Sequence, residues 1–164
     1  MSAGFTVRDA TAADSAAVLA LNNAAVPHVN ALTPDEFTWI VERAGHYRVA
    51  EDSEGVAGFV LCIPSGLEYW SANYKWFAER YDSFLYLDRV VVAPRLRRAG
   101  VGRAMYEDLH KAIARQWPRV ALEVNLRPPN PVSIDFHQAM RYAAVGVREY
   151  DDGDKAVQMF VREF

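Results

Sequence analysis

Residues 88–102 read DRVVVAPRLRRAGVG, and the interpretation of the whole chain starts from this stretch. Its three consecutive β-branched residues, Val90, Val91 and Val92, are typical of a buried strand. A turn rich in arginine and glycine follows. From residue 101 onward, apolar side chains recur at i, i+3, i+4 and i+8, which places them on one face of a helix. The stretch therefore predicts a strand, a basic glycine turn and a helix, in that order.

The predicted turn has the properties of an anion site. A helix N-terminus leaves backbone N–H groups unpaired and carries partial positive charge. Glycines let the backbone approach a ligand closely, and four arginines within residues 95–103 add full charges to a chain whose formal net charge is -3. These features favour a phosphate or pyrophosphate ligand over a solvated basic loop.

The spacing of the glycines narrows the choice of ligand. The P-loop pattern is absent, and the dinucleotide fingerprint needs a third glycine where this chain has Met105. Arg97-x-x-Gly100-x-Gly102 instead resembles the Arg/Gln-x-x-Gly-x-Gly/Ala signature of the GNAT superfamily, the Gcn5-related N-acetyltransferases. The resemblance implies that the turn holds the pyrophosphate of acetyl-CoA. The residues it assigns to this contact are Arg97, Arg98, Ala99, Gly100, Val101, Gly102 and Arg103.

Composition sets bounds on the kind of protein. With 51% hydrophobic and 24% charged residues, the chain is expected to form a single globular domain over residues 1–164. The sequence pI of about 5.8 argues against a general nucleic-acid binder. Cys62 is the one cysteine, which excludes an intrachain disulfide. No signal or membrane segment is recognised in the sequence. For both reasons we expect a cytoplasmic protein. The four histidines show no metal-ligand spacing, so no metal is expected.

Hydrophobic periodicity and turn residues predict an α/β (α+β) chain. Strands are expected over residues 5–8, 47–50, 56–63, 85–92, 120–126, 146–150 and 157–164. Helices are expected after Thr11 or Asp14, after Thr33, from about residue 100, and over residues 131–142. Residues 64–83 are interpreted as an irregular connection rich in aromatic side chains. The resulting order is that of the GNAT fold, which implies a mixed central sheet of about seven strands flanked by helices and splayed between the fourth and fifth strands.

The family resemblance also assigns the acyl-bearing arm of the donor. In GNAT enzymes this arm lies beside the splayed strand and pairs with its free backbone groups, as an added strand would. Carried over, this assigns the arm to Val90, Val91 and Val92, with one backbone N–H polarising the acetyl carbonyl. These valines can equally be plain core residues, and the two roles are compatible because side chain and backbone act separately.

A second stretch, Asn130-Pro131-x-Ser133-x-x-Phe136-His137, resembles the family signature Asn-x-x-Ala/Ser-x-x-Phe-Tyr. It implies that Asn130 and Ser133 contact the CoA arm. His137 stands where a family tyrosine protonates the departing thiolate. An imidazolium could do so, because the ordinary pKa of histidine, about 6.5, lies near cellular pH. Packing of His137 against the CoA arm is the alternative.

Several carboxylates could take the proton that an attacking amine must lose. Asp88 is the first choice, because it shares a strand face with Tyr86 and lies close to the predicted thioester site. A structural ion pair with Arg89 is the alternative for Asp88. Glu123 and Asn125 share a face of the next strand and are assigned to the acceptor side, where Glu123 could also accept the proton. Tyr86 is a second candidate for the thiolate acid.

The acceptor site borders two further segments in this family. Asn22, Asn23, His28 and Asn30 lie at the end of the first helix or between the first two helices, with ordinary loop capping as the alternative. The aromatic stretch would form the other wall through Tyr69 and Trp70, with core or dimer surface as the alternative.

Together these features predict an N-acetyltransferase that moves acetyl from acetyl-CoA to a primary amine of a small molecule or peptide, by direct attack in a ternary complex. A non-catalytic acyl-CoA sensor of the same fold and an unrelated phosphate-binding protein are the alternatives. A homodimer is also expected, because the aromatic content and the final strand, residues 157–164, would offer apolar surface and a pairing edge. The sequence does not determine the acceptor, and neither nucleic acid nor membrane is expected as a partner.

Overall fold

The computed structural model describes residues 4–164 and divides the chain into two compact units. The first contains residues up to Ile63 together with Leu87–Ile113, and the second contains Pro64–Tyr86 together with Ala114–Phe164. Hydrogen-bonded strands follow the order β1-β2-β3-β4-β5-β7-β6. This is the mixed seven-stranded sheet that the family resemblance implied. A single domain over residues 1–164 stays a prediction.

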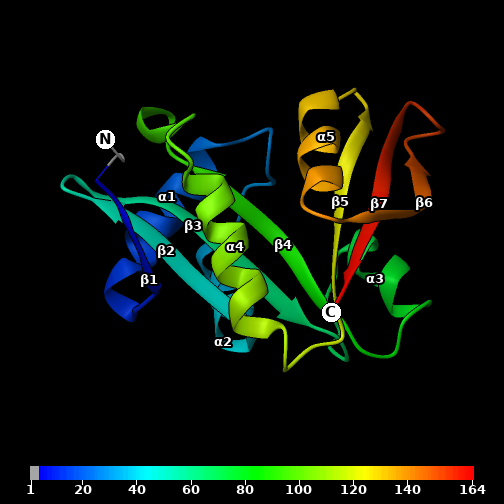
Figure 1. The fold of residues 1–164 in the computed structure, drawn as a ribbon, viewed down its shortest axis with the longest axis horizontal. Helices are drawn as coiled ribbons and strands as arrows, with labels where there is room; N and C mark the ends of the chain where they lie inside the picture. The colour runs from blue at the N-terminus through cyan, green and yellow to red at the C-terminus, as the bar shows by residue number, and fades with distance from the viewer. Residues whose placement is uncertain (1–3) are drawn as a thin grey trace. The chain divides into compact units, whose positions relative to one another are not determined.

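The first unit is built from three antiparallel neighbours, the end of a fourth strand, and helices on both sheet faces. Its elements are β1 (Thr6–Asp9), η1 (Ala12–Asp14), α1 (Ser15–Ala24), α2 (Pro34–Arg43), β2 (His46–Asp52), β3 (Gly55–Pro64), most of β4 (Leu85–Val92), η2 (Pro94–Leu96) and α4 (Val101–Ile113). Figure 1 shows α4 over one face of these strands and α1 and α2 behind them. The predicted start of α2 is confirmed, because the Thr33 hydroxyl accepts a hydrogen bond from the Glu36 amide and the Glu36 carboxylate accepts one from the Thr33 amide.

The second unit contains the start of β4 and the C-terminal strands. Its other elements are α3 (Ala72–Ala78), β5 (Arg119–Arg127), α5 (Pro131–Ala139), β6 (Ala143–Tyr150) and β7 (Lys155–Glu163). β4 pairs with β5 in parallel at Leu85↔Val120 and Tyr86↔Ala121, which are the first residues of β4. A parallel pair of this kind fits the splayed strands of the implied fold. β5 also pairs with β7, and β7 with β6, both antiparallel.

Two expectations about this unit are wrong. The stretch predicted to be irregular contains the helix α3, whose seven residues include three aromatics with modest helix propensity. Ser71 caps it, and Tyr74 and Phe77 are fully buried, so packing rather than propensity stabilises it. The final strand is also not an edge, because β7 lies between β5 and β6. The edge strand of this unit is β6. The expectation that the final strand offers a pairing edge for a homodimer is therefore wrong.

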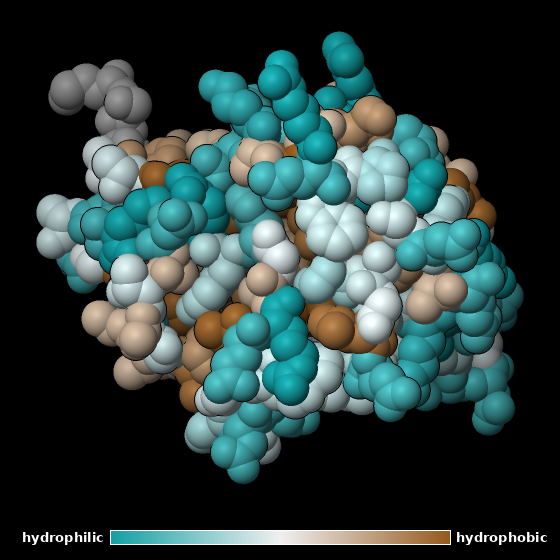
Figure 2. Space-filling model, turned by 90° about the horizontal axis from the view of Figure 1, so that it is seen from below, coloured by the Kyte–Doolittle hydropathy of each residue, from teal (hydrophilic) through white to brown (hydrophobic). Residues whose placement is uncertain are grey.

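The core is mainly aliphatic in the first unit, whereas the core of the second contains a cluster of aromatic rings. Val49, Phe59 and Val60 are among the fully buried residues of the first unit. In the second, the Tyr74 and Phe77 rings lie 5.7 Å and 6.0 Å from the Tyr86 ring. The surface seen in Figure 2 is mostly hydrophilic, with hydrophobic residues in small separate areas. No helix within residues 4–164 has the length and apolar composition that a membrane crossing requires.

Candidate active site

The basic glycine turn is an open loop that leads into α4. After η2, Arg98 and Gly100 adopt left-handed backbone with φ of 67° and 85°. α4 then begins at Val101. In the part of the chain that the structure describes, the backbone N–H groups of Gly100, Val101 and Gly102 have no hydrogen-bond acceptor. Unpaired N–H groups at the start of a 13-residue helix provide the donors and the dipole that an anion requires.

Two of the four arginines in the turn already have acidic partners. The Arg95 guanidinium contacts the Asp52 carboxylate at 3.0 Å and 3.1 Å and the Glu54 carboxylate at 3.2 Å. Arg103 lies 3.8 Å from Glu107 one helical turn on, and both side chains are exposed. Their positive charges are therefore partly neutralised before any ligand binds.

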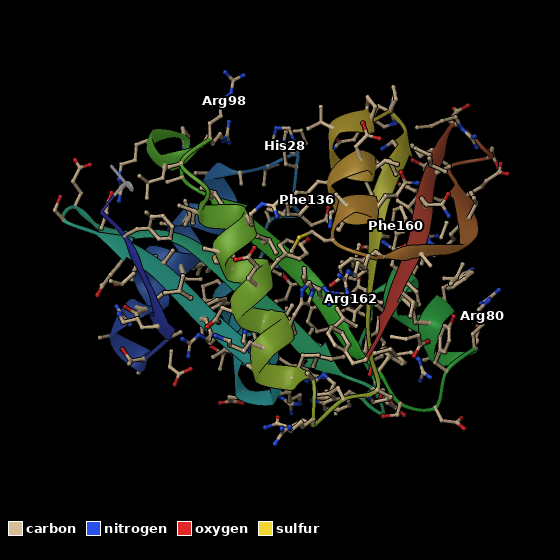
Figure 3. All side chains as sticks on the ribbon, viewed as in Figure 1. His28, Arg80, Arg98, Phe136, Phe160 and Arg162 are labelled. Carbon is tan, nitrogen blue, oxygen red and sulfur yellow. The ribbon has the colours of Figure 1, made fainter. Side chains whose placement is uncertain are left out.

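Arg97 and Arg98 differ from these two in having no acidic partner. Both are exposed, and within residues 4–164 neither side chain makes a hydrogen bond or an ion pair. Figure 3 shows Arg98 extending away from the ribbon of its unit. An exposed, unpaired guanidinium can form charge-assisted hydrogen bonds to a phosphate without first breaking an ion pair. These two arginines are the strongest candidates for the anion contact.

The two signature glycines serve different purposes. Gly100 needs its left-handed backbone, where a side chain would be strained. Gly102 lies inside α4 without a positive φ, and a Cβ built on it would meet no atom within 4 Å. Nothing in the described chain therefore requires glycine at position 102. The absence of a side chain leaves open space beside unpaired N–H groups, and this is the property of a cradle for a phosphate group. The predicted pyrophosphate residues fit that ligand.

The end of β4 shows the alternation expected of a strand. Val91 is buried at 6% exposure, whereas Val90 and Val92 are half-buried. The side chain of Val91 is therefore a core residue, as the simpler interpretation had it. The role of the β4 backbone toward an acyl group stays a prediction.

Asp88 and Arg89 form a buried ion pair. The Arg89 Nε lies 2.7 Å from the Asp88 Oδ2, and the two side chains are 7% and 5% exposed. Arg89 also donates to the Asn22 Oδ1 at 3.0 Å and to the Asn30 carbonyl at 3.1 Å. Removing one partner of a buried ion pair leaves the other charge uncompensated, which is strongly destabilising. The geometry thus favours the structural interpretation of Asp88 over its role as the first-choice proton acceptor.

The asparagines assigned to the acceptor side fix the segment between α1 and α2. Asn22 donates to the Asn23 side chain at 3.0 Å and to the Asn30 carbonyl at 3.1 Å. Asn23 holds Leu32 from both sides, donating to its carbonyl at 3.1 Å and accepting from its amide at 2.9 Å. Loop fixation is therefore their observed role. His28 lies exposed in the same segment.

A second polar group is centred on Glu123 in β5. The Tyr86 hydroxyl lies 2.7 Å and 2.8 Å from the two carboxylate oxygens, so its single hydrogen is shared between them. Asn73, from the helix that sequence patterns missed, donates to Glu123 at 2.9 Å. Arg148 in β6 donates to the Asn73 Oδ1 at 2.6 Å. Tyr86 and Asn73 thus orient the Glu123 carboxylate from β4 and α3, and Arg148 orients Asn73 in turn.

The other acceptor-side predictions have mixed outcomes in the structure. Tyr69 is 2% exposed and its ring packs edge-on against Tyr74 at 5.4 Å, so it is a core residue. Trp70 is 46% exposed. Asn125 is exposed on β5 and pairs opposite Val157.

His137 lies buried in α5 at 6% exposure. Its Nδ1 lies 2.7 Å from the Ser133 carbonyl, which can only accept, so Nδ1 carries the proton of the neutral ring. Burial lowers the pKa of His137, and the contact with Ser133 opposes this only in part. The ring stacks on Phe160 at 6.1 Å and packs edge-on against Tyr142 at 5.6 Å. A neutral imidazole with its proton held by the helix is a poor acid, so the geometry favours the packing interpretation.

The start of α5 is built by Asn130. Its side chain accepts a hydrogen bond from the Ser133 amide at 3.3 Å, which caps the helix. The Ser133 hydroxyl lies 3.3 Å from the His137 Nδ1. Both predicted CoA-arm residues thus have local structural roles at a helix N-terminus. Contact with CoA stays a prediction for each.

Comparison with known proteins decides the family. The acetyltransferase (GNAT) family matches the sequence over residues 16–142. The chain belongs to this family. As a GNAT acetyltransferase it transfers an acetyl group, and the matched residues include β4, the basic glycine turn and α4.

Solved structures with low sequence identity share the fold of this acetyltransferase. Arabidopsis thaliana NAA60 in complex with acetyl-CoA is 19% identical, with a TM-score of 0.75 over 98% of this chain and 99% of that one. Chaetomium thermophilum Naa20 in complex with a bisubstrate analogue is 22% identical, with a TM-score of 0.71 over 97% and 86%. An N-acetyltransferase from Staphylococcus aureus Mu50 is 18% identical, with a TM-score of 0.71 over 98% of each chain. At these identities the likeness shows the fold alone.

Sequence reasoning missed Asn73 and Arg148. Both depend on α3, whose one local signal was the Ser71 cap, which accepts from the Tyr74 amide at 3.2 Å. In the described part of the acetyltransferase, no group of three or more His, Cys, Asp or Glu side chains is arranged to hold a metal ion.

Proposed function

We propose that this acetyltransferase moves the acetyl group of acetyl-CoA to a primary amine of a small molecule or peptide, by direct attack in a ternary complex. The observation that carries the proposal is the start of α4. There, unpaired N–H groups, two unpaired arginines and a glycine with open space at its Cα are the groups that would bind a pyrophosphate. The acetyl-CoA complex of a protein with this fold supports the same donor.

The donor would be held by residues of the first unit. Arg97 and Arg98 would contact its phosphates together with the amides of Gly100, Val101 and Gly102. When bound, acetyl-CoA supplies an activated thioester carbonyl. The backbone of Val90–Val92 is the proposed source of the N–H group that polarises this carbonyl.

Glu123 is the proposed partner of the acceptor amine. Asp88 is committed to the Arg89 guanidinium, whereas Glu123 accepts hydrogen bonds from Tyr86 on β4 and Asn73 on α3. Two donors on different elements fix the direction of the carboxylate, and a carboxylate held in place can bind an ammonium group or take its proton. Tyr86 is the proposed proton donor to the thiolate, because Glu123 can return a proton to it across 2.7 Å.

Direct attack is supported by the state of the single cysteine. Cys62 is fully buried, and burial raises the pKa of its thiol, so it is neither accessible nor ionised. An acyl-enzyme on Cys62 is therefore not part of the proposal. Its burial also helps the assay, because free CoA can be followed with a thiol reagent against a low background from the protein.

The proposal is tested in two steps. Thermal unfolding is measured with acetyl-CoA, ATP or NAD, since a selective ligand stabilises the protein in proportion to its excess over Kd. Stabilisation by acetyl-CoA alone is expected, and equal stabilisation by ATP or NAD would indicate a general phosphate binder. CoA release is then measured with a panel of primary amines. Selective binding of acetyl-CoA with no turnover on any amine or peptide would instead support an acyl-CoA sensor.

A homodimer and a cytoplasmic location are part of the same proposal. The exposed edge strand β6 carries Val145 and Val147, which are 38% and 49% exposed and could pair across a dimer. The mass in solution at micromolar concentration tests this, and a monomer would refute the homodimer.

A further inference from the structure

Asn73 joins a cation to a carboxylate through a single amide group. Its Nδ2 lies 2.9 Å from the Glu123 Oε1, and its Oδ1 lies 2.6 Å from the Arg148 Nε. A guanidinium can only donate hydrogen bonds, and a carboxylate can only accept them. The amide orientation is therefore fixed by chemistry, with oxygen toward Arg148 and nitrogen toward Glu123. Of side chains this short, asparagine alone offers both groups in one plane.

We propose that Asn73, oriented by Arg148, is a positioning residue that holds the Glu123 carboxylate in the direction that the acceptor amine requires. Tyr86 fixes the carboxylate from β4 and Asn73 fixes it from α3. Two donors on different elements restrict both the rotation and the position of the carboxylate. The role rests on the proposed function, in which Glu123 meets the acceptor amine.

The helix that carries Asn73 is itself held rigidly in the second unit. A Cβ built on Gly146 of β6 would lie 2.5 Å from the Trp76 Cζ2, so the indole packs directly on a strand position without a side chain. The Arg80 guanidinium covers the ring at 3.6 Å from its centroid. Tyr74 and Phe77 of the same helix are buried. Asn73 therefore projects from a fixed turn of α3 rather than from a mobile loop.

The contacts of Asn73 explain why an amide suits this place. Its oxygen accepts from the Arg148 guanidinium while its nitrogen donates to the Glu123 carboxylate. The amide thus transmits the orientation set by Arg148 to the carboxylate. The Tyr86 hydroxyl meets the same carboxylate from β4.

The decisive substitution is Asn73→Asp, which keeps the size of the side chain and strengthens its contact with Arg148. It replaces the donor to Glu123 with a second carboxylate, and like charges at this separation oppose ionisation. We expect the acid limb of the pH–kcat/KM profile to move upward by about one pH unit or more. We also expect KM for the amine to rise at neutral pH, while Kd for acetyl-CoA stays unchanged.

A matched control separates positioning from helix stability. Ser71→Ala removes the cap of α3 without touching Glu123, so it should lower Tm and leave the acid limb in place. Arg148→Gln should act in the same direction as Asn73→Asp with a smaller effect, because the amide of Asn73 is then free to turn. An acid limb that moves in the Ser71→Ala variant as far as in Asn73→Asp would overturn the positioning role.

A readout without turnover keeps the inference separate from the proposed function. The carboxyl carbon of Glu123 is followed by NMR across pH in the wild type and in Asn73→Asp, with Glu123→Gln to assign the signal. In Asn73→Asp the midpoint of the Glu123 titration is expected to shift upward even if the protein acetylates no amine. A shifted midpoint together with no acetyl transfer would refute the proposed function and leave the inference standing. Identical midpoints in the two proteins would overturn the inference.

Discussion

Gly102→Ala should make the protein more stable and a weaker binder of CoA. Gly102 lies in α4 without a positive φ, and an added Cβ meets no protein atom within 4 Å. Replacing such a glycine by alanine commonly adds about 0.4–1 kcal/mol to the free energy of unfolding, because the unfolded chain loses freedom. For a chain of 164 residues this corresponds to a rise in Tm of about 1–4 °C.

The added methyl group should have the opposite effect on the ligand. It occupies the space through which a phosphate reaches the unpaired amides of Gly100, Val101 and Gly102. A lost hydrogen bond to a charged group costs about 1.5–3 kcal/mol, and every 1.4 kcal/mol is tenfold in Kd, so CoA should bind roughly ten- to a hundredfold more weakly. Calorimetric titration with CoA and thermal unfolding without ligand measure the two effects.

Gly100→Ala is the matched control for this prediction. At φ of 85° a side chain is strained, so both stability and affinity should fall. Stability and affinity thus change in opposite directions at Gly102 and in the same direction at Gly100. A Gly102→Ala protein that binds CoA as tightly as the wild type would refute the assignment of this turn to the pyrophosphate.

Three further predictions follow from individual side chains. Arg97→Ala and Arg98→Ala should each raise Kd for CoA about tenfold or more. Arg95→Ala should raise it less, because the Arg95 side chain is already paired with acidic residues. Equal losses of CoA affinity in the three variants, measured by a binding titration, would contradict this. Because burial lowers the pKa of His137, the unfolded state binds a proton on this residue at higher pH than the folded state, and stability falls as pH drops below about 6.5. His137→Phe should reduce this fall in Tm and leave kcat unchanged. A tenfold loss of kcat in that variant would instead support His137 as the acid. The hydrogen bonds from Arg8 lower the pKa of Asp14 to about 2, so the stability they give is present above pH 4 and is lost between pH 4 and 2. In Asp14→Asn, the free energy of unfolding measured with urea should therefore depend less on pH over that range.

The strand, turn and helix around the predicted donor site could be predicted because their signals are local. The valine strand, the glycine turn and the apolar face of α4 are encoded within 26 consecutive positions, 88–113. The cap of α2 is equally local, with Thr33 and Glu36 three residues apart. The sequence could not show which of the four arginines lack an acidic partner, because the partners of Arg95 lie about 40 residues earlier in the chain.

The helix α3 escaped prediction because its stability is tertiary. Seven residues are too few for an isolated helix, and their aromatic content suggested a loop or a binding wall. What holds the helix is a strand glycine far along the chain, Gly146, whose missing side chain accommodates Trp76. The sequence contains Gly146 but does not show that Trp76 packs on it.

The choice of proton acceptor also depended on contacts that a sequence does not contain. From the sequence, Asp88 and Glu123 are two carboxylates on the strands β4 and β5, and Asp88 had the better position beside the signature turn. In the structure Asp88 is 2.7 Å from a buried guanidinium, whereas Glu123 accepts from a phenol and an amide. A carboxylate paired with a buried cation has a structural role, since removing one partner of such a pair is destabilising. Glu123 is instead oriented from two elements, β4 and α3, and this geometry, more than proximity in sequence, makes it the group to test as the partner of the amine.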